Sequence, residues 1–266
     1  MTALATAFRT TGAAALAGLQ DYLAIFSARS WLAGWYVRVL AQVAFFALVG
    51  RVLGSEEQTR YLLVGNAVAL VSIQALGAVN STVWERRSGT LPLLVASPSP
   101  VAAVFLGRSL HWIPDGLTSS FGALLVVGPL FGLPLPWERV VALVPLVLLV
   151  GVSTYCFGLV LGALVLRATS LRNLVGNLAY TGMLALCGVN VPVGYAPAPV
   201  QAVANALPLT HGLRAVREVL AGGGFASVAG DVGAEALVGA AWLAVALVLF
   251  GRLAGAGRRD GSIEFG

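Results

Sequence analysis

The sequence predicts an all-α integral membrane protein with six transmembrane helices, for three reasons. Of its 266 residues, 58% are hydrophobic and only 10% are charged, whereas soluble domains carry about 25% charged residues. The apolar residues gather in runs of about 20, the length that a helix needs to cross the hydrocarbon core of a bilayer. Lipid offers no hydrogen-bond partners to the backbone, so these runs should be helical.

The expected spans follow one another closely, which leaves no room for a separate soluble domain. They cover residues 32–53, 61–83, 113–133, 140–166, 171–192 and 234–256. We therefore treat residues 31–256 as one transmembrane domain. Residues 257–266 are expected to form a cytoplasmic tail.

Residues 1–30 are expected to form an amphipathic helix in front of the first span. Its apolar residues recur at helical spacing, while polar residues occupy the other faces; the apolar set is Leu4, Phe8, Ala15, Leu19, Leu23 and Phe26. This pattern favours a helix that lies in the membrane interface. The alternative is a helix packed on the protein's own cytosolic surface.

The distribution of arginine predicts the orientation in the membrane. With the N-terminus inside, the inner arginines are Arg9, Arg29, Arg86, Arg87, Arg108, Arg167, Arg172, Arg252, Arg258 and Arg259. The outer ones are Arg60, Arg139, Arg214 and Arg217, with Arg51 near the outer edge. The positive-inside rule then places both termini in the cytoplasm. We expect a multi-pass protein of a bacterial plasma membrane. Membrane orientation explains the net charge of +5 better than nucleic-acid binding does. The sequence contains no lysine, which excludes a P-loop.

Two connections have sequence patterns of their own. The inner one, residues 84–100, begins with the polar turn Glu85, Arg86, Arg87, Ser88, Gly89 and Thr90. The outer one, residues 193–233, carries two short apolar stripes at helical spacing, separated by Pro208. These stripes predict two short outer helices, followed by a glycine-rich hinge at residues 222–224.

These two connections resemble the corresponding segments of ABC type-2 permeases. The residues Glu85–Leu91 and Ser97–Pro100 resemble the segment after that family's second span. Cys187–Pro192, Leu207–His211, Arg214 and Arg217 resemble the end of the fifth span and the outer helices. Arg87 departs from the family's second acidic position. The drug- and lipid-exporting branch is the more similar one.

The resemblance implies the permease subunit of an ABC exporter for an amphiphilic drug, antibiotic or lipid. A second permease, identical or homologous, and a separate ABC ATPase would be its partners, in contact with membrane lipid and without nucleic acid. ATP and Mg would bind to the ATPase, with no cofactor, metal or catalytic site on this chain. Residues Glu85–Thr90 would couple the ATPase to the helices of the permease. The outer re-entry motif would comprise Gly188, Pro192, Pro208, His211 and Arg214.

Polar residues within the apolar runs are candidates for a substrate path. They are Arg38, Asn66, Gln74, Asn173, Asn177 and Thr181. Such residues either line a path or form hydrogen bonds between helices. His111 and Asp115 are four residues apart, a helical spacing that suggests a proton relay and an alternative function as a proton-coupled secondary transporter. Because the pair lies near Arg108 at the inner end of the third span, the other interpretation is a hydrated or partner-facing site at the membrane interface. Cys156 and Cys187 are expected to be packing residues.

Overall fold

The computed structural model describes residues 3–96, 100–133, 135–166 and 168–260, and these residues form helices and connections without a strand. The helices are α1 (Ala3–Ile25), α2 (Ala28–Ser30), the π-helix η1 (Trp31–Tyr36), α3 (Val37–Val52), α4 (Glu56–Ala75), α5 (Ala78–Arg87), α6 (Leu91–Ala96), α7 (Val101–Arg108), α8 (Trp112–Leu130), α9 (Trp137–Val165), the 3₁₀ turn η2 (Thr169–Leu171), α10 (Arg172–Leu186), the 3₁₀ turn η3 (Val193–Tyr195), α11 (Ala198–Ala206), α12 (Thr210–Leu220) and α13 (Phe225–Asp260). Our predictions for Ser97–Ser99, Arg167 and residues 261–266 lie outside the described residues.

Five helical stretches of the described chain are long and apolar enough to cross a membrane. They are Ala28–Val52, Glu56–Arg87, Val101–Leu130, Trp137–Val165 and Phe225–Ala256. Each contains or overlaps one of the expected spans. The prediction of an all-α membrane protein is therefore confirmed.

The expected fifth span, residues 171–192, is a shorter helix in the structure. Helix α10 has 15 residues, which gives a length of about 22 Å at about 1.5 Å per residue. The hydrocarbon core is about 30 Å thick, so α10 alone is too short to cross it. The helix ends before Gly188, whose φ of +79° is not helical. The sixth crossing stays a prediction.

Two other boundaries differ from the expected spans. The expected span 61–83 is broken between α4 and α5 at Gly77, where an added Cβ atom would lie 2.5 Å from the ring of Trp112. The last helix, α13, begins at Phe225, directly after a turn in which Gly222 has a φ of +103°. Residues 225–233, which we grouped with the outer helices, therefore belong to α13.

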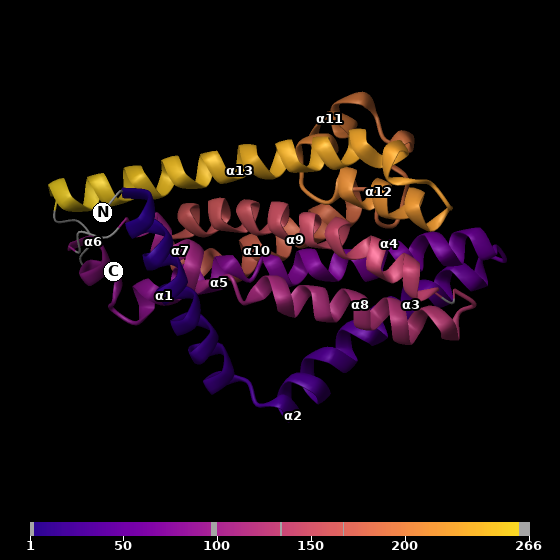
Figure 1. The fold of residues 1–266 in the computed structure, drawn as a ribbon, viewed down its shortest axis with the longest axis horizontal. Coiled ribbons are helices and arrows are strands. Elements are labelled where there is room, and N and C mark those ends of the chain that lie inside the picture. Colours follow the sequence, from indigo (N-terminus) through magenta and orange to yellow (C-terminus); the bar gives the residue numbers. More distant parts are fainter. Residues whose placement is uncertain (1–2, 97–99, 134, 167, 261–266) are drawn as a thin grey trace.

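The helices form an elongated bundle with different elements at its two ends (Figure 1). The start of α1, helix α6 and the last turns of α13 lie at one end, which we call the α6 end. Helices α11 and α12 and the turn between α3 and α4 lie at the other, the α12 end. This arrangement brings together the segments that we expect on one side of the membrane.

Helix α4 is the centre of the bundle. It packs against α3, α8 and α9. The most apolar part of the stretch Glu56–Arg87, which contains α4 and α5, is 94% buried, compared with 17% for that of Phe225–Ala256. Leu237, Val245 and Val248 of α13 and Phe45 and Leu48 of α3 are exposed. Apolar residues on the outside of a bundle are typical of helices that face lipid.

Helix α1 packs on α7 through small residues. An added Cβ atom at Gly18 would lie 2.1 Å from the carbonyl oxygen of Arg108, and one at Gly107 would lie 2.3 Å from that of Thr11. The apolar side chains of Phe8 and Leu23 point away from the bundle and are exposed. The helix therefore has one face on the protein and a second, apolar face that is exposed.

We expect Gly18→Leu to separate α1 from α7. Overpacking costs about 1–3 kcal/mol, so a cysteine introduced at the buried Ala14 should react with a maleimide about tenfold faster in the Gly18→Leu background. Gly12→Leu is the matched control, because nothing lies within 4 Å of a Cβ atom at Gly12. Equal rates in the two backgrounds would show that the close approach does not hold α1.

Candidate functional site

The turn between α5 and α6 lies at the α6 end and ends α5 with a Schellman motif. The amide of Thr90 donates to the carbonyl of Glu85 at 3.1 Å, and the amide of Gly89 donates to that of Arg86 at 3.2 Å. This motif requires a left-handed residue, and Gly89 supplies it with a φ of +69°. Glycine at this position thus sets the direction in which the chain leaves α5.

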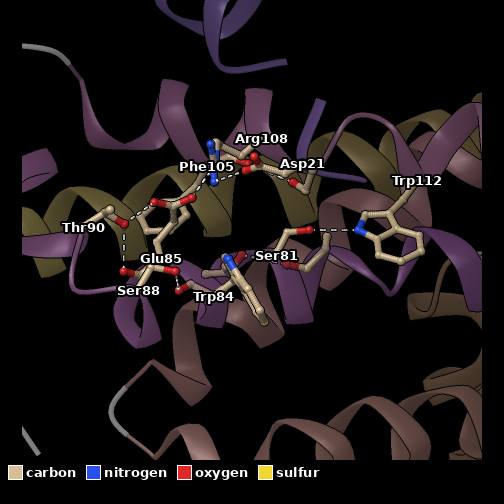
Figure 2. Close-up of polar contacts among 12 residues, drawn as sticks. Asp21, Ser81, Trp84, Glu85, Ser88, Thr90, Phe105, Arg108 and Trp112 are labelled. Atoms are coloured by element: carbon tan, nitrogen blue, oxygen red, sulfur yellow. Dashed lines mark hydrogen bonds and ion pairs between the residues drawn. The ribbon is translucent and has the colours of Figure 1, made fainter. Parts of the chain in front are cut away.

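The carboxylate of Glu85 is buried behind this turn (Figure 2). It forms an ion pair with Arg108 and accepts a hydrogen bond of 2.6 Å from the hydroxyl of Thr90. Arg108 also forms an ion pair of 2.8 Å with Asp21 of α1. Glu85 thus connects α5 with α7 and α1, and its carboxylate is not exposed for contact with another protein.

The remaining residues of the predicted coupling segment divide into two groups. Arg86 turns inward and donates to the carbonyl of Leu166, just after α9. Arg87, Ser88 and Gly89 are exposed, as is Trp84, whose exposed fraction is 53%. We call Trp84, Arg87, Ser88 and Gly89 the turn surface, because they are the exposed residues of this segment.

A cavity of about 380 Å³ lies between η1, the break after α4, and the first turns of α10. It is lined by Tyr22, Phe26, Trp31, Trp35, Arg38, Ile73, Gln74, Leu76, Gly77, Val79, Asn80, Trp112, Asp115, Arg172, Asn173, Gly176, Asn177 and Tyr180. Among the predicted path residues, Arg38, Gln74, Asn173 and Asn177 belong to this lining.

The other two predicted path residues lie elsewhere. Asn66 is fully buried, and its amide donates to the side-chain oxygen of Asn190 and to the carbonyl of Leu62, both at 2.9 Å. It therefore joins α4 to the segment after α10. Thr181 is exposed on α10, outside the lining of the cavity.

Asp115 accepts three side-chain hydrogen bonds at the wall of the cavity. The donors are the hydroxyl of Tyr22 at 3.1 Å, the indole of Trp31 at 2.9 Å and the amide of Gln74. They come from α1, η1 and α4, so this carboxylate holds three elements together. The sequence did not identify Tyr22 or Trp31, because neither is close to Asp115 along the chain.

The predicted relay between His111 and Asp115 is not formed. His111 is the N-cap of α8, and the amide of Asp115 donates to its carbonyl at 3.3 Å. The described side-chain partners of Asp115 are Tyr22, Trp31 and Gln74, and His111 is not among them. The imidazole ring instead packs against Tyr22 and Trp112, with centroid distances of 4.9 Å to each ring. Proton-coupled transport through this pair is therefore not proposed.

At the α12 end, Glu235 of α13 forms a buried cap for α12. Its carboxylate is fully buried and accepts the backbone N–H groups of Leu209 and Gly212, both at 2.9 Å, and the hydroxyl of Ser153. Carboxylates are favourable at helix N-termini because the first N–H groups have no partner within the helix. Leu209 has a φ of 87°, an uncommon value for a residue other than glycine.

Arg217 connects α12 to the segment after α10. Its guanidinium donates to the carbonyls of Gly188 at 2.8 Å and of Val189 and Tyr61 at 3.1 Å. It also lies 3.5 Å from the centroid of the Tyr61 ring. Burial lowers the pKa of Arg217 to about 10, which leaves it charged at neutral pH.

The predicted re-entry residues are brought together in part. The Nδ1 atom of His211 lies 2.7 Å from an Arg214 nitrogen and 3.4 Å from a carboxylate oxygen of Asp231. The backbone carbonyl of Pro208 accepts a hydrogen bond of 3.6 Å from the thiol of Cys187. Gly188 is bound by Arg217, as described above, and Pro192 precedes the turn η3. Among the described residues, no group of three acidic, histidine or cysteine side chains is arranged to hold a metal ion.

The helical spans, the turn at the α6 end and the capped short helices at the α12 end define a multi-pass membrane protein. The family model of the ABC-2 type transporter matches residues 23–221, about three quarters of the chain. The chain therefore belongs to the ABC-2 type transporter family, which confirms the resemblance inferred from the sequence. It contains the membrane permease part of an ABC-type transporter. No curated protein and no solved structure matches the chain.

Proposed function

We propose that the chain is the permease subunit of an ABC exporter that moves an amphiphilic drug, antibiotic or lipid-like compound out of the cell. A separate ATPase subunit hydrolyses ATP with Mg and supplies the energy. The family match over residues 23–221 is the observation that carries this proposal. The family implies an ABC ATPase as a partner, in a membrane setting.

In this proposal the ATPase docks on the turn surface, with both termini in the cytoplasm. Movement of that surface reaches Glu85 through Thr90 and then passes to α7 and α1 through Arg108. Two helices of the cavity region, α3 and α10, expose apolar side chains such as Leu48, Leu174 and Leu178. A second permease, identical or homologous, would cover part of these faces.

The test is transport into inside-out vesicles that contain the permease and its co-purified ATPase. A fluorescent amphiphile should accumulate only with ATP and Mg, and accumulation should stop when the P-loop lysine of the ATPase is replaced. A protonophore should leave the initial rate unchanged. Transport that persists with the inactive ATPase and stops with the protonophore would refute the proposal in favour of proton coupling.

A further inference from the structure

The cavity beside α10 contains two arginines without a carboxylate partner among the described residues. Arg38 lies with its guanidinium carbon 4.1 Å from the centroid of the Trp35 ring, a cation–π contact. Its N–H donors have no hydrogen-bond partner among the described residues. Arg172 is the first residue of α10 and lines the same cavity. Neither forms an ion pair with a described residue.

The acidic residue in the lining, Asp115, offsets only one of these two charges. Asp115 accepts hydrogen bonds from Tyr22, Trp31 and Gln74, so its oxygens are already engaged by the protein. The N-terminus of α10 adds a partial positive charge on the same side as Arg172. The cavity therefore has an excess of positive charge.

The rest of the lining is suited to an apolar body. Trp31, Trp35, Trp112 and Tyr180 line the cavity, and aromatic side chains provide large apolar contact areas. The volume of about 380 Å³ falls within the range of about 300–1,000 Å³ that is usual for pockets holding small molecules. Aromatic walls and two free guanidinium groups together match a molecule with one apolar body and one negative group.

We propose that this cavity selects an anionic amphiphile, a compound with a single apolar body and one carboxylate or phosphate group. Arg38 and Arg172 bind the negative group, because the planar guanidinium forms paired hydrogen bonds with carboxylate and phosphate oxygens. The tryptophans of η1 and Trp112 contact the apolar body. This inference rests on the proposed function in one respect, since it takes the cavity as part of the transport path and names the substrate class.

The experiment uses the purified permease without its ATPase, in detergent, with brominated dodecanoate as the probe. Bromine atoms quench nearby indoles, and three tryptophans line the cavity, so binding should appear as saturable loss of tryptophan fluorescence. Brominated dodecanol and a brominated dodecylammonium salt have the same chain without the negative charge. We expect each to bind at least about tenfold more weakly than the carboxylate, as charge-assisted hydrogen bonds contribute strongly to affinity.

Substitution of both arginines tests the assignment directly. The variant Arg38→Gln with Arg172→Gln should bind the carboxylate about tenfold more weakly, and the wild-type affinity should fall with salt. Arg252→Gln is the matched control, because Arg252 is exposed on α13 and does not line the cavity. A further arm with brominated phosphatidylglycerol distinguishes a bilayer lipid from a single-chain compound.

Three outcomes would overturn the inference. They are equal quenching by the alcohol and the carboxylate, unchanged affinity in the double variant, and saturation by the phospholipid with the same dependence on both arginines. Each concerns binding to the permease alone. The ATP-dependent transport assay would still decide the proposed function, so failure of the two can be distinguished.

Discussion

Replacing Glu235 by alanine is expected to lower the free energy of unfolding by about 3 kcal/mol. The carboxylate satisfies three buried donors, the amides of Leu209 and Gly212 and the hydroxyl of Ser153. Each buried donor left without a partner costs about 1–3 kcal/mol, and the loss of a helix cap costs about 1 kcal/mol. Rearrangement around the smaller side chain recovers part of the sum of these costs.

Thermal unfolding of the purified permease in detergent measures this effect. At about 2–4 °C per kcal/mol for a chain of this size, the midpoint should fall by about 10 °C. Glu218→Ala is the matched control, since Glu218 is exposed on the same short helix; its midpoint should stay within about 2 °C of the wild type. Similar midpoints for the two variants would show that Glu235 does not stabilise α12.

The membrane helices were predictable because their cause is local in the sequence. A bilayer requires about 20 consecutive apolar residues, and such a run can be read without knowledge of its neighbours. The break at Gly77 was not predictable, because it depends on the Trp112 ring, which is far away in the sequence. The length of α10 depends likewise on Gly188, whose position is set by Arg217.

The candidate sites were only partly predictable for the same reason. The motif Glu85–Thr90 is contiguous and was found directly. Spacing along the chain identifies neighbours on one helix, whereas Asp115 is bound by Tyr22, 93 residues away in the sequence. The capping role of Glu235 likewise depends on partners that are 23 and 26 residues away in the sequence. Tertiary contacts of this kind have no local sequence signal.

Replacing Glu85 by glutamine is expected to uncouple ATP hydrolysis from transport. The substitution keeps the size of the side chain but removes the buried charge that pairs with Arg108. Breaking a buried ion pair by removing one partner costs about 3–5 kcal/mol, and the partial exposure of Arg108 reduces this to about 2 kcal/mol. Movement of the turn surface would then no longer pass to α7 and α1, so ATP-driven export should fall about tenfold or more, while ATPase activity persists.

Within the segment Glu85–Thr90, Glu85 is buried and Arg87 is exposed, so we expect different effects from the two substitutions. Arg87→Gln should weaken binding of the ATPase by up to about fivefold, as expected for an exposed charge, and it should leave the export per ATP hydrolysed unchanged. Glu85→Gln should have the opposite pattern, with normal ATPase binding and low export per ATP. If Glu85→Gln instead weakened ATPase binding and kept the ratio of export to hydrolysis, the Glu85 carboxylate would reach the partner directly, and its burial in the permease alone would not describe the assembled transporter.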